Sequence, residues 1–220
     1  MKQLLLLLML ILLCSCGEKN KTEKVVATTV QKSKYRTLLS KFENISIDTL
    51  EIYSSENFGI YKGVQIDSLD AILFPKEIAE AYFLEHDIYA CCKFDIDSSK
   101  IGLIVRTPSM YVPSSIKLFV FDKITDNISE YIELAESWGD AGDAIEKTSW
   151  LIKNPSNKIN VLTREIESHD HSVEDENDTI VESWDKYYLF AFNHKLDTIN
   201  KNSDLLKKKF NVILNKQASH

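Results

Sequence analysis

Near-strict alternation of apolar and polar residues recurs in short segments along this chain, and it restricts the fold more than any other feature. Residues 45–53 show the pattern most clearly. Successive side chains of a strand point to opposite faces, so this pattern predicts strands with one buried face. We expect strands over residues 45–53, 58–66, 88–96, 101–106, 116–122, 128–134, 149–152, 159–166 and 187–193.

Short, turn-forming segments separate most of these strands. Examples are residues 97–100 and 123–127, both rich in Asp, Ser, Asn and Lys. Tight turns and spacings of about ten to fifteen residues predict an antiparallel meander, whereas the spacing of a doubly wound parallel sheet is missing. A β-sandwich, a curved sheet with packed helices and propeller-like blades remain open, although no internal repeat supports a full propeller.

Helical periodicity is confined to a few segments. Pro75 suits the first turn of a helix over residues 75–86, and Ser203 or Asp204 suits the cap of a C-terminal helix over residues 203–214. A short helix beginning near Thr29 is a third candidate. The predicted fold class is therefore mainly β with minor α: an antiparallel, sandwich-like sheet with one internal and one C-terminal helix.

The composition is that of a globular protein. Hydrophobic residues make up 44% and charged residues 27% of the 220 residues, and the net charge is -7. An acidic chain lacks the clustered Lys and Arg that nucleic-acid phosphates require, so we expect no nucleic-acid partner.

The N-terminus begins with a basic tip, Met1-Lys2-Gln3, which is followed by ten residues, Leu4 to Leu13, without a polar side chain. This arrangement is typical of an export signal. A helix that spans a membrane needs about 20 apolar residues, so this run is too short to remain as a permanent anchor.

Leu13-Cys14-Ser15-Cys16-Gly17 follows the apolar run and resembles the lipobox of bacterial lipoproteins. The resemblance implies cleavage before Cys16 and attachment of acyl chains to that cysteine. Two or more chains hold a protein firmly on a membrane. By the same analogy, Gly17 favours the outer membrane. We therefore expect a signal peptide over residues 1–15, a lipidated cysteine and flexible tether over residues 16–34, and a single β-rich domain over residues 35–220.

Two cysteines, Cys91 and Cys92, remain for the folded domain. As neighbours on a strand they point to opposite faces, so we expect one buried and one half-buried thiol and no disulfide. The cysteine spacing does not match a zinc site.

An acidic segment over residues 165–178 is the first candidate binding site. Its carboxylates and its Asn offer the oxygen ligands that calcium prefers, and its two histidines suit a transition metal if the segment is extended. The alternative is a solvated acidic hairpin loop. The candidate ligands are His169, His171, Asp175 and Asp178.

Trp138-Gly-Asp-Ala-Gly-Asp143 is the second candidate. Its glycines permit positive φ angles, Asp140 and Asp143 suit a cation or a sugar hydroxyl, and Trp138 suits stacking on a sugar ring. The alternative is a loop in which Trp138 fills the edge of the core. The interpretation as a binding site is favoured if this segment lies beside the acidic segment in the fold.

No motif of a known enzyme class stands out: the chain lacks a Gly-x-Ser-x-Gly elbow, a His-Glu-x-x-His motif and a Gly-rich phosphate loop. Arg106, at a predicted strand end, suits either an anionic ligand or an internal acid. We expect a lipid-anchored envelope lipoprotein with a non-catalytic domain that binds an unknown protein or glycan. No cofactor is expected, with calcium at the candidate sites as the alternative. The alternatives are an envelope hydrolase acting on glycan or peptide and a lipoprotein that neutralises a toxin.

Overall fold

The computed structural model describes residues 32–54, 61–108, 115–192 and 196–215. The predicted signal peptide, Cys16 and most of the predicted tether lie outside the described residues, as does part of the predicted strand 58–66. Ser33–His220 form one compact unit. None of the helices in the described part of the chain is long and apolar enough to cross a membrane.

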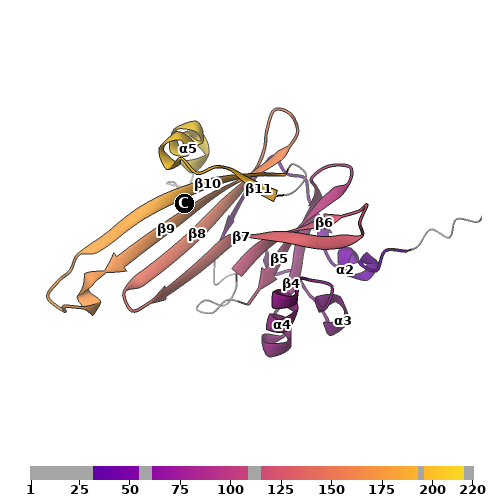
Figure 1. Cartoon of the computed structure of the whole chain (residues 1–220), viewed down its shortest axis with the longest axis horizontal. Helices are drawn as coiled ribbons and strands as arrows, with labels where there is room; N and C mark the ends of the chain where they lie inside the picture. Colours follow the sequence, from indigo (N-terminus) through magenta and orange to yellow (C-terminus); the bar gives the residue numbers. More distant parts are fainter. Residues whose placement is uncertain (1–31, 55–60, 109–114, 193–195, 216–220) are drawn as a thin grey trace, which may run out of the picture. The chain divides into compact units, whose positions relative to one another are not determined.

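The unit is built on an antiparallel meander in which each of eight successive strands pairs with the next (Figure 1). This confirms the predicted mainly β fold class. The strands are β4 (Tyr89–Asp95), β5 (Lys100–Thr107), β6 (Ser115–Asp122), β7 (Asn127–Asp140), β8 (Asp143–Lys153), β9 (Ile159–Asp170), β10 (Val181–Phe192) and β11 (Leu196–Asn200).

Three short strands pair with strands of the meander. β1 (Glu43–Asn44) runs parallel to β4, β3 (Val64–Gln65) pairs with β4, and β2 (Thr49–Tyr53) pairs with β8. The predicted strand 45–53 is therefore wrong in its first part. Backbone hydrogen bonds to β4 and to β8 hold the two ends of residues 45–48, which cross from one part of the sheet to the other.

β7 divides the sheet into two regions because its first part pairs with β6 and its last part, from Glu136, pairs with β8. We call β1 and β3–β6 with the first part of β7 the first half. We call the last part of β7 with β8, β9 and β10 the blade. In Figure 1 the blade strands run on to a free end, away from the first half.

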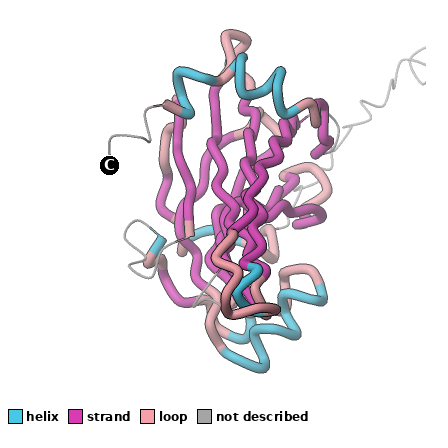
Figure 2. Tube along the Cα trace, turned by 90° about the vertical axis from the view of Figure 1, so that its left-hand side faces the viewer, coloured by secondary structure: helices cyan, strands magenta, loops and turns pink. Residues whose placement is uncertain are grey.

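One set of helices packs on the first half and another set packs on the blade, and the two sets lie on opposite sides of the unit (Figure 2). α2 (Arg36–Ser40), α3 (Ser68–Ala71) and α4 (Lys76–Glu85) pack on the first half, where Tyr35, Leu38, Phe74 and Ile78 meet strand residues such as Phe119. α4 confirms the helix predicted over residues 75–86.

α5 (Ser203–Lys209) and α6 (Asn211–Leu214) pack on one face of the blade at its inner end. Leu206 contacts a cluster that contains Trp150 and Tyr187. The predicted single helix is interrupted at Phe210, and the cap is the side chain of Asn202, which accepts a hydrogen bond from the Leu205 amide, and not Ser203 or Asp204.

A third apolar cluster joins the two regions. Ile104 and Leu118 of the first half meet Leu151 and Val161 of the blade, as in a sandwich. Cys91 and Cys92 both belong to this cluster and are 6% and 9% exposed, so the prediction of one half-buried thiol is wrong. The register shift between Ala90 and Cys92 explains this, because a bulge breaks the alternation of faces. Burial raises the pKa of the Cys91 thiol to about 11 and that of Cys92 to about 12, so both stay protonated at neutral pH.

Candidate functional site

The blade strands continue well beyond their predicted ends. β7 has 14 residues and β8 has 11. A two-residue turn joins them, with Ala141 at φ 49° and Gly142 at φ 91°. Turns with two positive φ values match the twist of antiparallel strands and favour long hairpins. Residues 138–140 and Asp143 therefore lie on strands, and the predicted loop is reduced to two residues.

The register of these strands places polar and aromatic side chains in rows on one face. Residues directly opposite each other on paired strands project to the same side. We call this side of the blade the open face. Its three outer rows are Asp140, Asp143, His169 and Glu182; Trp138, Ile145, Glu167 and Trp184; and Glu136, Lys147, Glu165 and Lys186.

Two tryptophans flank the middle row of the open face. Trp184 is 45% exposed, and its indole N–H donates a hydrogen bond to Glu167 Oε2 over 2.5 Å. Lys186 also pairs with Glu167, and these two donors lower the pKa of Glu167. Trp138 is half-buried and belongs to none of the apolar clusters among the described residues. The two indoles thus border a surface that water reaches.

The innermost of the three rows joins an internal network of charges. Glu133 accepts hydrogen bonds from Ser115 and Lys117, with 2.9 Å between its carboxylate and the Lys117 ammonium. Burial alone would raise the pKa of Glu133. The positive charge of Lys117 and the hydrogen bonds from Ser115 and Lys117 outweigh burial and lower the pKa. The pKa of Glu136 is raised by burial and by the negative charge of Glu133. Of these two carboxylates, Glu136 is therefore the one whose ionisation is disfavoured.

A cavity of about 310 Å³ lies at the base of the open face. Lys147 and Glu165 within it form an ion pair of 3.5 Å. A second cavity of about 290 Å³ shares three of its lining residues and reaches the start of α4. The first cavity is lined by Ile132, Glu133, Lys147, Thr163, Glu165, Tyr188, Phe190, Thr198 and Lys201.

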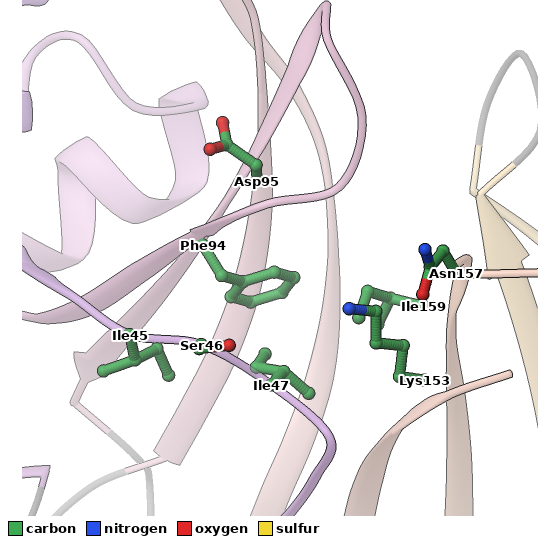
Figure 3. Close-up of a pocket in the computed structure, with 8 residues that line it drawn as sticks. All are labelled: Ile45, Ser46, Ile47, Phe94, Asp95, Lys153, Asn157 and Ile159. Atoms are coloured by element: carbon green, nitrogen blue, oxygen red, sulfur yellow. The ribbon is translucent and has the colours of Figure 1, made fainter.

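A separate cavity of about 270 Å³ lies at the inner end of the blade, beside the turn between β8 and β9, on the seam with the first half (Figure 3). Phe94 and Ile47 lie on one side of it, and Lys153, Asn157 and Ile159 lie on the other. It is a gap where residues 45–48 cross between the two regions, and it contains none of the predicted site residues.

At the free end of the blade, the structure brings three predicted site residues together. His169 Nδ1 lies 2.8 Å from Asp143 Oδ1, and the His169 and His171 rings are 4.7 Å apart. The hydrogen bond to Asp143 raises the pKa of His169. Glu174 and Glu182 complete the cluster, at 3.8 Å from His169 Nε2 and 3.9 Å from His171 Nε2.

The other predicted ligands do not join this cluster. Asp175 accepts two hydrogen bonds from Asn177, and Asp178 accepts one from the Ile180 amide, so both stabilise local turns. Asp140 faces Asp143 across the hairpin, two strands from His169. Oxygen ligands are thus not gathered around one point as calcium requires. Among the described residues, His169, His171 and Glu174 are the group whose ligand atoms lie close enough to hold a metal.

Arg106 is used internally. It is 4% exposed, its Nε–H donates to the Tyr61 carbonyl over 3.1 Å, and its guanidinium stacks on Tyr89 at 3.7 Å. Asp87 lies 3.9 Å away. The interpretation of Arg106 as a ligand-binding residue is therefore not supported by its position.

Glu182 and Trp184 were not predicted from the sequence, and Glu167 and Glu174 were included only as carboxylates of the acidic segment 165–178. The pairing register of β8–β10 places Glu167, Glu182 and Trp184 on the open face, because it sets them opposite residues 13 to 22 positions away. Comparison of the chain with protein-family models, curated proteins and solved structures gave no match.

Proposed function

We propose that this protein is a lipid-anchored lipoprotein of the cell envelope, held in the outer membrane, whose β domain binds a glycan without catalysis. The signal-like N-terminus and the lipobox-like sequence before Cys16 support the anchor. The open face of the blade supports the binding role.

The observation that carries the ligand class is the row Trp138–Ile145–Glu167–Trp184. An indole presents a flat, electron-rich face, which suits the C–H groups on one side of a sugar ring. The two indoles lie at opposite ends of a row of four strands, about 14 Å apart at a strand spacing of about 4.8 Å. Carboxylates and lysines in the adjacent rows suit the hydroxyl groups of an extended glycan.

Sedimentation with insoluble bacterial cell-wall glycan tests the binding role. We expect Trp138→Ala and Trp184→Ala each to lower the retained fraction about five- to tenfold, because each removes a stacking contact of about 1–1.5 kcal/mol. Phe83→Ala is the matched control, since Phe83 is an exposed aromatic residue of α4 (53%) away from the open face. Unchanged retention of both tryptophan variants would contradict the proposal.

We propose binding without turnover because the carboxylates that line the cavity are paired with lysines. Glu133 is paired with Lys117, and Glu165 is paired with Lys147. A general acid needs a raised pKa, whereas the pKa of Glu133 is lowered, and Glu136, whose pKa is raised, does not line the cavity. Release of new reducing ends from the same glycan by the wild-type protein, abolished in Glu133→Gln, would favour the hydrolase alternative.

The lipid anchor is tested by labelling with radioactive palmitate in a bacterial host. We expect Cys16→Ser to abolish the label and membrane sedimentation, whereas Cys14→Ser, two residues away in the expected signal peptide, retains both. A Cys16→Ser chain that is processed, unlabelled and still sediments with membranes would contradict the anchor.

A further inference from the structure

The histidine cluster at the free end of the blade has the arrangement of a metal site. The ligand atoms of His169, His171 and Glu174 all lie within 4.8 Å of one another. Bonds of about 2.0–2.1 Å to a tetrahedral ion place ligands about 3.3 Å apart. The three groups thus need to approach by roughly 1–1.5 Å, which side-chain rotations at a partly exposed hairpin end allow.

Asp143 fixes the tautomer of His169. An ionised carboxylate can only accept a hydrogen bond, so the Nδ1 atom that lies 2.8 Å from Asp143 Oδ1 carries the proton. The lone pair of His169 is then on Nε2, the atom that faces Glu174. A carboxylate that orients a metal-binding histidine in this way recurs in zinc sites.

His171 supplies a second, independent observation. Its Nε2 atom is buried and has no hydrogen-bond partner, although the ring as a whole is partly exposed. The nearest carboxylate oxygen, from Glu182, is 3.9 Å away and too distant for a hydrogen bond. A buried nitrogen without a partner is destabilising unless it binds something.

Local structure explains how these residues meet. His169 is on β9, and β9 ends at Asp170, whose side chain accepts a hydrogen bond from the Ser172 amide and begins the short 3-10 helix His171–Val173. The helix turns the chain so that Glu174 returns towards His169. The Asp170 amide also donates to the Gly142 carbonyl over 2.8 Å, which ties the β7–β8 turn to this site.

We propose that His169, His171 and Glu174 bind a divalent transition metal of the zinc class, with Asp143 holding the His169 ring. Two imidazole nitrogens and one carboxylate favour zinc over calcium, which takes oxygen ligands. Three protein ligands leave a fourth position for water or a ligand atom. This proposal does not depend on glycan binding.

Titration of the full processed protein, in detergent, with Co²⁺ and Zn²⁺ tests the site. We expect one saturable site, with the visible absorption of tetrahedral cobalt, that Zn²⁺ displaces. His169→Gln, His171→Gln and Glu174→Gln should each weaken Zn²⁺ binding at least about tenfold, and Asp143→Asn by about 10- to 100-fold. The Glu174 side chain is 71% exposed, so its variant tests the site with little risk to folding.

Matched controls separate the site from adventitious chelation. Glu176→Gln changes an exposed acid of the same turn, and His86→Gln changes an exposed histidine elsewhere. A double variant of His194 and His220, which lie outside the described residues, removes the remaining imidazoles. All three should bind Zn²⁺ like the wild type. Absence of saturable binding, or binding that survives His171→Gln and Glu174→Gln but is lost in a control variant, would overturn the proposal.

Discussion

The inner and outer ends of the blade strands differ in burial, although the same backbone hydrogen-bond ladder runs through both. At the inner end, Trp150, Leu162 and Leu189 lie opposite one another and are at most 3% exposed beneath α5. At the outer end, Trp138 of β7 and Trp184 of β10 lie on the opposite face of the sheet and remain accessible. Main-chain hydrogen bonds therefore extend the sheet beyond the point where apolar burial stabilises it, and the outer residues are the ones that we propose contact the glycan.

Trp150→Ala should lower the stability of the domain more than any other variant proposed here. Removal of a fully buried indole leaves a cavity and costs about 3–5 kcal/mol. For a domain of this size the melting temperature should fall by on the order of 10 °C, as circular dichroism would record. A fall of less than about 2 °C would show that the inner end is not the stabilising part of the blade.

Gly102→Ala should be the next largest change. A methyl group on Gly102 would lie 2.3 Å from the ring of Phe94, which covers this glycine in the core. We expect a loss of about 1–3 kcal/mol in the free energy of unfolding measured with urea. Gly139→Ala, at an exposed position of the outer blade, is the control and should lower the free energy of unfolding less. Equal losses would contradict the difference in packing between the core of the first half and the outer blade.

Glu136→Gln should raise stability modestly, by up to about 1 kcal/mol. The pKa of Glu136 is raised in the folded state, so its ionisation reduces stability as pH rises through that value. The glutamine variant should melt higher than the wild type at pH 7, and the gain should vanish below about pH 4, where the wild-type acid is protonated in both states.

Glu133→Gln should change the stability in the direction opposite to Glu136→Gln. The pKa of Glu133 is lowered in the folded state, so its charge stabilises the protein at neutral pH, and this contribution disappears as pH falls through the folded pKa. We expect the variant to melt lower than the wild type at pH 7 and to approach it in acid. A gain at pH 7 would show that the internal network is arranged differently.

The smallest effect on stability is expected from Trp184→Ala. The side chain is 45% exposed and its hydrogen-bond partner Glu167 keeps Lys186, so the loss should stay within about 0.5 kcal/mol. The melting temperature should therefore change by only 1–2 °C, while retention on cell-wall glycan falls. A loss of stability that matches Trp150→Ala would assign Trp184 to the core.

The strand predictions agree best with the structure where burial is strong. Residues 116–122 were predicted as a strand and β6 spans Ser115–Asp122. In the outer blade both faces contact water, so Glu165–Asp170 show no apolar face although they pair along their whole length. This is why the sequence suggested loops there. The bulge at Cys91 and the break in residues 45–48 depend on tertiary hydrogen bonds and leave no local signal.

Part of the candidate site was visible in the sequence. The residue types of His169, His171 and Asp143 suggested ligands, but nothing local placed Asp143 beside His169, 26 positions away. Asp175 and Asp178 share the same chemistry and instead form turns. Trp184 was overlooked because its neighbours resemble a polar loop, and only its register with Glu167 assigns it to the open face.

Amide hydrogen exchange of the processed protein, with and without soluble cell-wall glycan fragments, tests whether the outer blade binds the glycan. We expect added protection on ligand addition only in the outer parts of β7–β10, in peptides that contain Trp138, Lys147, Glu167 and Trp184. Protection at the seam cavity beside Phe94 or beneath α5 instead, or no change in the outer blade at saturating glycan, would contradict it.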